Sequence, residues 1–204
     1  MTGSIFMPKA DQIHESWFSE WGRQIGSERL GDALFKNARL KQRAYEHMVQ
    51  LSDLELDFKY SDDEWIALNT YATQRDALLR ICGMVIHGRL LRANIAKSEF
   101  ELLTKSLPPE ELRIAVNLRG LHIEDDDRAV DLPRVNQLIE RSGANCLAVW
   151  RENLPNQSQL RLELLEEFEA LALGSNGEVG PELAKEIVTQ VSRALTANKV
   201  PLAA

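Results

Sequence analysis

The sequence has little of what marks a secreted, membrane-spanning or disulfide-stabilised protein. Only 2 of its 204 residues are cysteine, and a chain of this length can bury a large core without disulfide bonds. Cys82 and Cys146 both lie in apolar stretches, so we expect them to be buried, reduced thiols. No apolar run reaches the roughly 18 to 20 residues of a membrane span, and the N-terminus lacks the pattern of a signal peptide. We therefore expect a cytoplasmic protein that reaches any membrane only through a partner.

Positive charge is also scarce. The chain has 24 Lys and Arg against 31 Asp and Glu, a net charge of -7, which argues against general binding of nucleic acid. The charges are unevenly placed, because residues 75–97 carry five bases and one acid, whereas residues 99–131 carry four bases and nine acids. Either these two segments pack together, or the basic segment is a docking surface.

Motifs of metal binding and catalysis are missing as well. No His-Glu-x-x-His or paired Cys-x-x-Cys motif occurs, and the four histidines are isolated: His14, His47, His87 and His122. Cys82 and His87 would lie about 140° apart on one helix, so they cannot form a nucleophile and base pair from that helix. The acidic run from Glu124 to Asp127 lacks the spacing of a calcium loop, and the glycine-rich loop at 174–180 lacks the Lys-Ser/Thr ending of a phosphate-binding loop. We expect no catalytic residue, no cofactor and no metal.

Helical periodicity dominates what is present. Apolar residues recur at intervals of three and four in most of the chain, and Ser61 with Glu64 forms a capping box that opens a helix. Thr73 offers a further N-cap, although the helices before and after it could be continuous. Leu54 to Tyr60 and Leu160 to Leu164 alternate like short strands, but we favour a helix for the second. The predicted fold is all-α with room for one or two short strands, a compact irregular bundle around a central buried helix.

The expected organisation follows the turn signals. We predict a flexible lead at 1–9, a helical domain over 10–173, a hinge loop at 174–180, and a C-terminal amphipathic helix and tail over 181–204. The last helix either docks on its own core or binds a groove of a neighbour.

The central helix is predicted over Leu78 to Ile95, where apolar residues surround the helix on most sides. Gly83 and Gly88 each cost about 1 kcal/mol inside a helix, so we expect another helix to approach closely there, with ligand contact as the alternative. A second long helix, opening at Pro133 and ending near Pro155, has Gly143 at a further close crossing. His87 and Trp150 complete the expected structural core.

Two blocks of residues resemble a known family. The segment Gly83-Met84-Val85-Ile86-His87-Gly88 is similar to the Gly-Leu-Val-Leu-His-Gly segment of the SctK (YscK-like) proteins, cytosolic accessory proteins of bacterial type III secretion systems. Leu138-Ile139-Glu140-Arg141-Ser142-Gly143 resembles that family's Ile-x-x-Ser-Gly pattern, and matching residues follow it: Leu147, Trp150, Pro155, Arg161 and Leu162. The resemblance covers about residues 74–165, and the N-terminal third matches only in being helical.

The resemblance implies a non-enzymatic adaptor of the injectisome sorting platform. Such a protein links the cytoplasmic domain of the inner-membrane ring protein SctD to the pod protein SctQ, and through SctL to the SctN ATPase. From side-chain chemistry we expect interface residues in three places: Arg89 and Arg92; Trp17 and Trp21; and Ile187, Val191 and Leu195. The alternatives are a type III secretion chaperone or another helical protein-binding module, and a cysteine-dependent enzyme.

Overall fold

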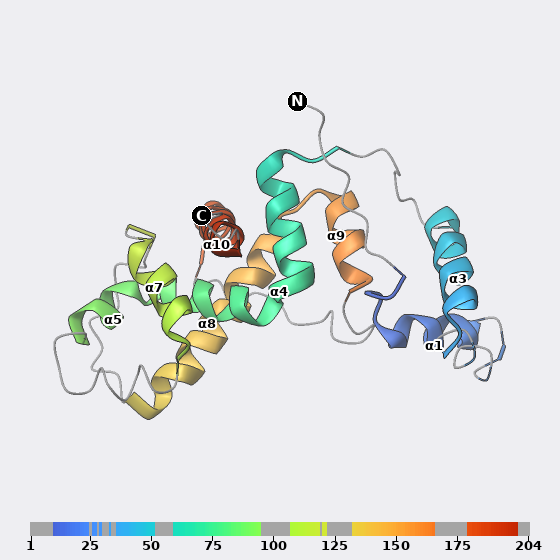
Figure 1. Ribbon diagram of the computed structural model, residues 1–204, viewed down its shortest axis with the longest axis horizontal. Coiled ribbons are helices and arrows are strands. Elements are labelled where there is room, and N and C mark those ends of the chain that lie inside the picture. Colours follow the sequence, from blue (N-terminus) through green and yellow to red (C-terminus); the bar gives the residue numbers. More distant parts are fainter. Residues whose placement is uncertain are drawn as a thin grey trace, which may run out of the picture. The chain divides into compact units, whose positions relative to one another are not determined.

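The fold is that of a computed structural model, which describes residues 10–24, 26–27, 29, 33, 36–51, 59–94, 107–118, 120–121, 132–165 and 179–199. These residues form eight helices and no strand (Figure 1). The predicted all-α class is confirmed. Leu160 to Glu163 belong to a helix, as favoured, whereas the alternating stretch 54–58 lies outside the described residues, as do 1–9 and 174–178.

The chain divides into two compact units. Unit 1 comprises Met1–Leu68 and Leu154–Leu173, and unit 2 comprises Asn69–Asn153 and Gly174–Ala204. The sequence predicted a single domain over 10–173. The two units do not follow this prediction. The chain passes from unit 1 to unit 2 inside a helix and returns to unit 1 for residues 154–173.

Unit 1 contains α1 (Glu15–Gln24), α3 (Ala38–Leu51), α9 (Asn156–Glu163) and the first residues of α4 (Asp62–Ile86). Its core joins residues from three parts of the chain: Ile13, Phe18, Ala44 and Leu164. The His14 amide donates to the Leu164 carbonyl at 3.0 Å, and the Trp17 indole Nε1 donates to the Glu163 carbonyl at 3.0 Å. Carbonyls at a helix C-terminus have no partner within the helix, so the start of α1 satisfies the end of α9.

The start of α4 is fixed by local sequence. The Ser61 amide donates to Glu64 Oε2 at 3.0 Å, and the Glu64 amide donates to Ser61 Oγ at 3.3 Å. This is the predicted capping box. Thr73 does not cap the next helical segment, because its hydroxyl donates back to the Asn69 carbonyl at 2.8 Å. The following residue, Gln74, departs from helical geometry, at φ -145° and ψ 36°, so α4 consists of two helical segments that meet at a kink there.

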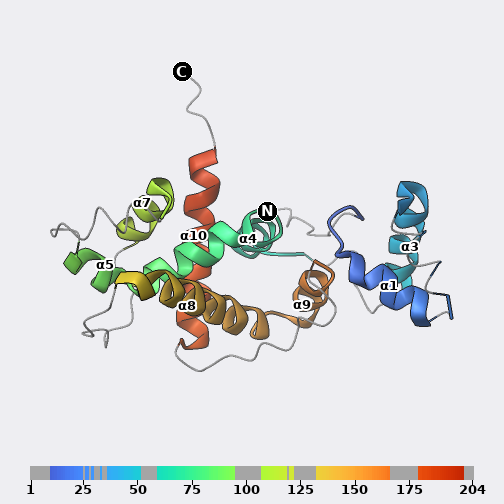
Figure 2. The same cartoon turned by 90° about the horizontal axis from the view of Figure 1, so that it is seen from below.

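Unit 2 contains the rest of α4, α5 (Gly88–Asn94), α7 (Pro109–Asn117), α8 (Leu132–Glu152) and α10 (Pro181–Lys199). The last helix, α10, packs against α8 and α7, and α5 packs against α7 (Figure 2). One side of α10 is buried along its length: Ala184, Ile187, Val188, Val191, Ser192 and Leu195. Of the two predicted arrangements, the helix therefore docks on its own unit. Within the described ranges, every helix is too short or too polar to cross a membrane.

Candidate functional site

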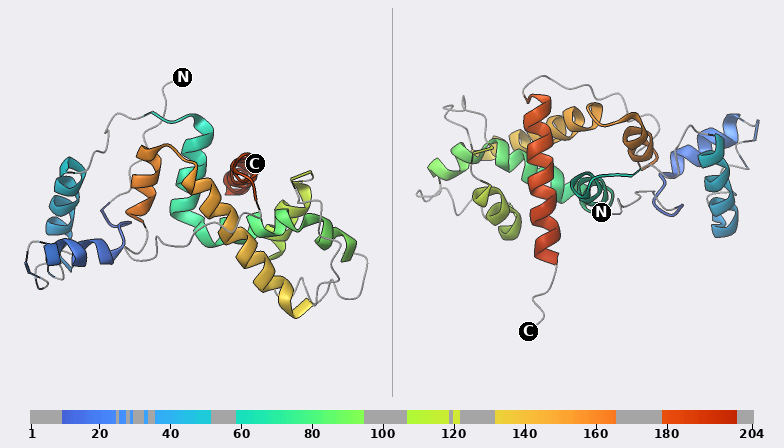
Figure 3. Two further views of the ribbon diagram at one scale, coloured as in Figure 1. Left: turned by 180° about the vertical axis from the view of Figure 1, so that it is seen from behind. Right: turned by 90° about the horizontal axis from the view of Figure 1, so that it is seen from above.

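Helices α4 and α8 cross in unit 2 (Figure 3). The two glycines predicted to mark close crossings, Gly83 of α4 and Gly143 of α8, both lie in this crossing. A Cβ atom added to Gly83 would collide with the Ile139 carbonyl oxygen and lie 3.1 Å from the Gly143 amide nitrogen. One added to Gly143 would collide with the Leu79 carbonyl oxygen and lie 3.2 Å from the Gly83 nitrogen. Backbone atoms of the facing helix therefore occupy the space beside each of the two glycines. This confirms that Gly83 and Gly143 each allow another helix to pack closely. The alternative, a ligand in contact with Gly83, has no space in this crossing.

A buried polar contact accompanies the crossing. His87 is 8% exposed, and its Nε2 lies 2.9 Å from Ser142 Oγ, 55 positions along the chain. The sequence predicted His87 as a residue of the structural core, and this is confirmed. Its position differs slightly, because His87 is the turn between α4 and α5, and the buried Gly88 begins α5 rather than lying within a helix.

The two cysteines lie in this crossing too. Cys82 and Cys146 are free thiols, and each is 0% exposed. Burial raises the pKa of the Cys82 thiol well above its usual value, and the hydrogen bond and charge of Cys146 act in the same direction. The thiolate is the nucleophilic form, so a buried, protonated thiol is poorly suited to attack a substrate.

Aromatic side chains extend the core of unit 2. Trp150 is 4% exposed, and its ring centroid lies 5.7 Å from that of Tyr71. The Arg75 guanidinium carbon lies 5.3 Å from the centroid of the Tyr71 ring. Trp150 is thus a core residue, as predicted.

The C-terminal residues of the second resemblance block belong to unit 1. Arg161 is 0% exposed, and its Nη1 donates to the Gln157 carbonyl at 2.7 Å and to Gln157 Oε1 at 2.9 Å. Its guanidinium carbon lies 5.8 Å from the centroid of the Tyr60 ring. Burial raises the pKa of Tyr60, and the charge of Arg161 opposes that rise. Arg161 is therefore a structural cation inside unit 1, not a surface anchor.

The basic segment 75–97 is partly used inside unit 2. Arg80 forms a two-pronged ion pair with Glu111 of α7, with Nη2 to Oε1 at 2.6 Å and Nε to Oε2 at 2.8 Å, and this hydrogen bonding raises the pKa of Arg80. This pair supports packing of the basic segment against the acidic one. Arg89 is exposed at the start of α5, whereas the side chain of Arg92 lies outside the described residues. A role of Arg89 at an interface stays a prediction.

The tryptophans predicted at an interface help to build the core of unit 1. Trp17 and Trp21 are both partly buried against its apolar cluster. Trp17 is also held by its hydrogen bond to Glu163, and the Trp21 ring centroid lies 5.7 Å from that of His47. Contact of their exposed parts with another protein stays a prediction.

The apolar residues of the last helix require a correction. Ile187 and Val191 are 0% exposed and Leu195 is 8% exposed, because they form the face that α10 turns toward its own unit. While α10 is docked, these three residues cannot contact another protein. Periodicity identified the apolar face but could not identify what covers it.

One set of exposed charges was not predicted from the sequence. Residues 29–43 carry five bases and one acid, a denser positive segment than 75–97. The structure exposes four of these bases in unit 1: Arg29, Lys36, Arg39 and Arg43. A short charge window over the N-terminal third would have found them.

In the described part of the chain, no three or more His, Cys, Asp or Glu side chains gather closely enough to hold a metal ion. Comparisons with family models, with curated proteins and with solved structures give no match to this chain. Function is therefore argued from the residues and from the resemblance of the two sequence blocks.

Proposed function

We propose that this protein is a non-enzymatic adaptor of the type III secretion sorting platform, joining the cytoplasmic domain of SctD to SctQ. One observation carries the proposal. The two blocks that resemble the SctK family meet in space, since Gly83 lies against Gly143 and His87 against Ser142. Residues that share a backbone contact constrain one another, so the two blocks are better understood as one structural signature than as two independent likenesses.

The adaptor role assigns the protein to the cytoplasmic face of the inner membrane, where the secretion apparatus would recruit it. SctL and the SctN ATPase would be reached indirectly, through SctQ. Binding would depend on a few exposed anchors, with charge setting orientation and association rate. Arg89 is the exposed candidate in unit 2.

Two alternatives fit the geometry less well. A cysteine-dependent enzyme requires an accessible thiol, and both thiols are buried in the α4–α8 crossing. A secretion chaperone would need an exposed apolar groove. Among the described residues, Leu40 is the large hydrophobic side chain that is exposed, at 38%, and the apolar face of α10 is covered.

The direct test is co-purification of the full chain with the cytoplasmic SctD domain and the SctQ encoded beside it, followed by light scattering of the complex. A complex containing all three proteins supports the bridge. A monomer that binds neither protein would overturn the proposed function and favour the chaperone and enzyme alternatives.

Charge reversal separates docking from packing. Arg89→Glu with Arg92→Glu should weaken binding of SctD or SctQ and leave the Tm nearly unchanged. Arg113→Glu is the control, because Arg113 is exposed and forms an ion pair only one turn away, with Glu110. If binding and Tm fall together in the double variant, the two arginines are structural.

A further inference from the structure

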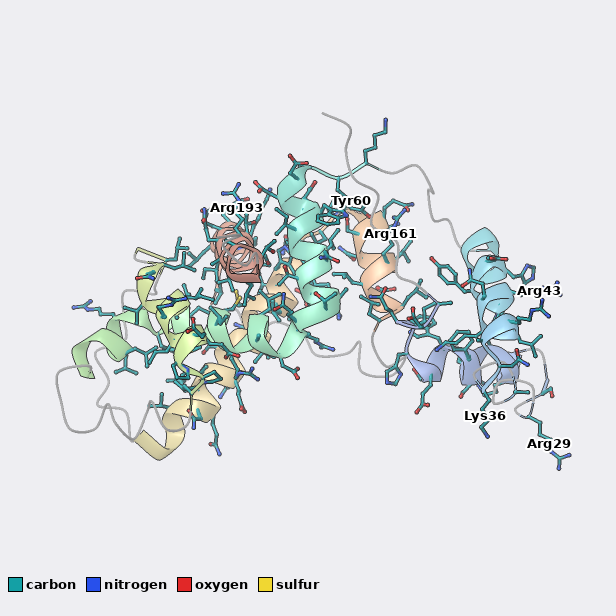
Figure 4. The ribbon with its side chains drawn as sticks, viewed as in Figure 1. Arg29, Lys36, Arg43, Tyr60, Arg161 and Arg193 are labelled. Carbon is teal, nitrogen blue, oxygen red and sulfur yellow. The ribbon has the colours of Figure 1, made fainter. Side chains whose placement is uncertain are left out.

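Unit 1 presents a positively charged surface, defined by Arg29, Lys36, Arg39, Leu40 and Arg43 and called the basic face below. All five residues are exposed. Figure 4 shows the side chains of Arg29, Lys36 and Arg43 extending outward from the helices of this unit. The face belongs to a chain with a net charge of -7, so its charge opposes that of the protein as a whole.

The cations of the basic face are not neutralised within the described part of unit 1. None of the four cations forms an ion pair with any described residue: Arg29, Lys36, Arg39 and Arg43. Two acids of α1 and α3 have other partners: Glu20 pairs with Arg23 at 2.7 Å, and Glu46 accepts a hydrogen bond from Gln42 at 3.0 Å. The remaining base, Lys41, points inward, with its Nζ 5.4 Å from the centroid of the Phe18 ring.

The helix itself adds to this positive charge. Asn37 caps α3, with its Oδ1 accepting the amides of Arg39 at 3.1 Å and Leu40 at 3.3 Å. The N-terminal end of a helix has a partial positive charge and favours acids, yet the first turn of α3 has none and carries Arg39 instead. This arrangement is locally unfavourable, and an acidic group bound from outside would relieve it.

An apolar side chain lies within the charge. Leu40 is 38% exposed, next to Arg39 and three residues before Arg43, so the three side chains share the outer side of α3. The buried side of the helix borders Leu40, because Ala44, one turn further on, lies in the core of unit 1 and Tyr45 packs against that core. The basic face therefore combines exposed cations with one apolar anchor.

We propose that the basic face binds an acidic segment of another protein, with carboxylates pairing with Arg39 and Arg43 and an apolar side chain covering Leu40. This rests on the proposed function to the extent that SctD and SctQ are the natural proteins to carry the segment. The net negative charge of the whole chain disfavours nucleic acid. An anionic membrane is disfavoured because a helix lying on a bilayer inserts a broad apolar face, and α3 exposes one leucine among the described residues.

The variant that tests the basic face is Arg39→Glu with Arg43→Glu in the full chain. Its control is Arg113→Glu with Lys185→Glu, which changes the net charge equally at exposed positions of unit 2. Leu40→Ala tests the apolar anchor without changing charge. All variants should melt within a few degrees of the parent, because the substituted side chains are exposed and the ion pair that the control removes, Arg113 with Glu110, lies at the surface.

Two binding measurements are made side by side. The first uses a fluorescent synthetic peptide of alternating glutamate and leucine, and the second uses the cytoplasmic SctD domain and SctQ. We expect the double variant to bind the peptide and one of the two proteins about tenfold or more weakly, while the control binds like the parent. Leu40→Ala should weaken binding by a smaller factor, and added salt should weaken binding of the parent more than of the double variant.

The results distinguish the two proposals. If the parent binds the peptide through Arg39 and Arg43 but neither SctD nor SctQ, the basic face stands and the adaptor function falls. If the parent binds SctD and SctQ and the double variant binds both equally well, the basic face is overturned and the adaptor function stands. Failure of the parent to bind the peptide, or tighter binding of duplex DNA or phosphatidylserine vesicles than of the peptide, would overturn the inference.

Discussion

In unit 2, α4 and α8 approach until backbone meets backbone, whereas in unit 1 the helices are joined through large side chains. The crossing of unit 2 depends on two residues without a Cβ, Gly83 and Gly143. The core of unit 1 instead places Phe18 against Ala44, with Trp17 and Trp21 partly buried around it. The crossing of unit 2 leaves no space for a larger side chain at either glycine. The core of unit 1 leaves aromatic and basic side chains at the surface.

This difference separates structural and binding roles. The resemblance to the SctK family is carried mainly by the crossing, where Gly83, His87, Ser142 and Gly143 are all buried and cannot touch a partner. The basic face of unit 1 instead carries four exposed cations within residues 29–43, and none of them forms an ion pair with a described residue. Residues that identify a fold need not be those that bind.

The largest effect is expected from adding one methyl group to the crossing. Gly83→Ala or Gly143→Ala should each lower the free energy of unfolding by about 3 kcal/mol or more, because the new Cβ meets a carbonyl oxygen that cannot move without shifting a helix. Urea unfolding followed by circular dichroism measures this loss. Gly180→Ala is the control, since nothing lies within 4 Å of its added Cβ and its stability should be nearly unchanged. A Gly83→Ala variant as stable as the parent would refute the backbone contact.

An intermediate effect is expected from the polar pair beside the crossing. Ser142→Ala should cost about 1 to 3 kcal/mol, because it leaves the buried His87 Nε2 without the hydroxyl that lies 2.9 Å away. A double-mutant cycle with His87→Ala should give a coupling energy of about 0.5 to 3 kcal/mol. Additive effects would mean that the two residues stabilise unit 2 independently.

The sequence predicts local features better than pairings between distant segments. Ser61 and Glu64 are three residues apart, so their capping box could be read directly, and the two glycines were conspicuous because glycine is costly in a helix. That Gly83 and Gly143 face each other could not be read, because periodicity says which face is buried and not against which helix. For the same reason the sequence left open whether Ile187 is buried under its own unit or contacts a neighbour, and its prediction as an interface residue was wrong. The division between Leu68 and Asn69 escaped because it falls inside the first helical segment of α4, before the kink at Gln74.

The smallest effect is expected in unit 1, where a substitution can test how much the looser core tolerates. Trp17→Phe keeps an aromatic ring against the cluster and removes the indole donor to the Glu163 carbonyl. Because Trp17 is only partly buried, water can replace that donor, and the loss should be about 0.5 to 1.5 kcal/mol. Trp21→Phe, which removes no hydrogen bond between described residues, should cost less in the same urea titration. A loss from Trp17→Phe as large as that from Gly143→Ala would show that unit 1 depends on an equally strict fit, and the contrast between a rigid unit and a tolerant one would no longer hold.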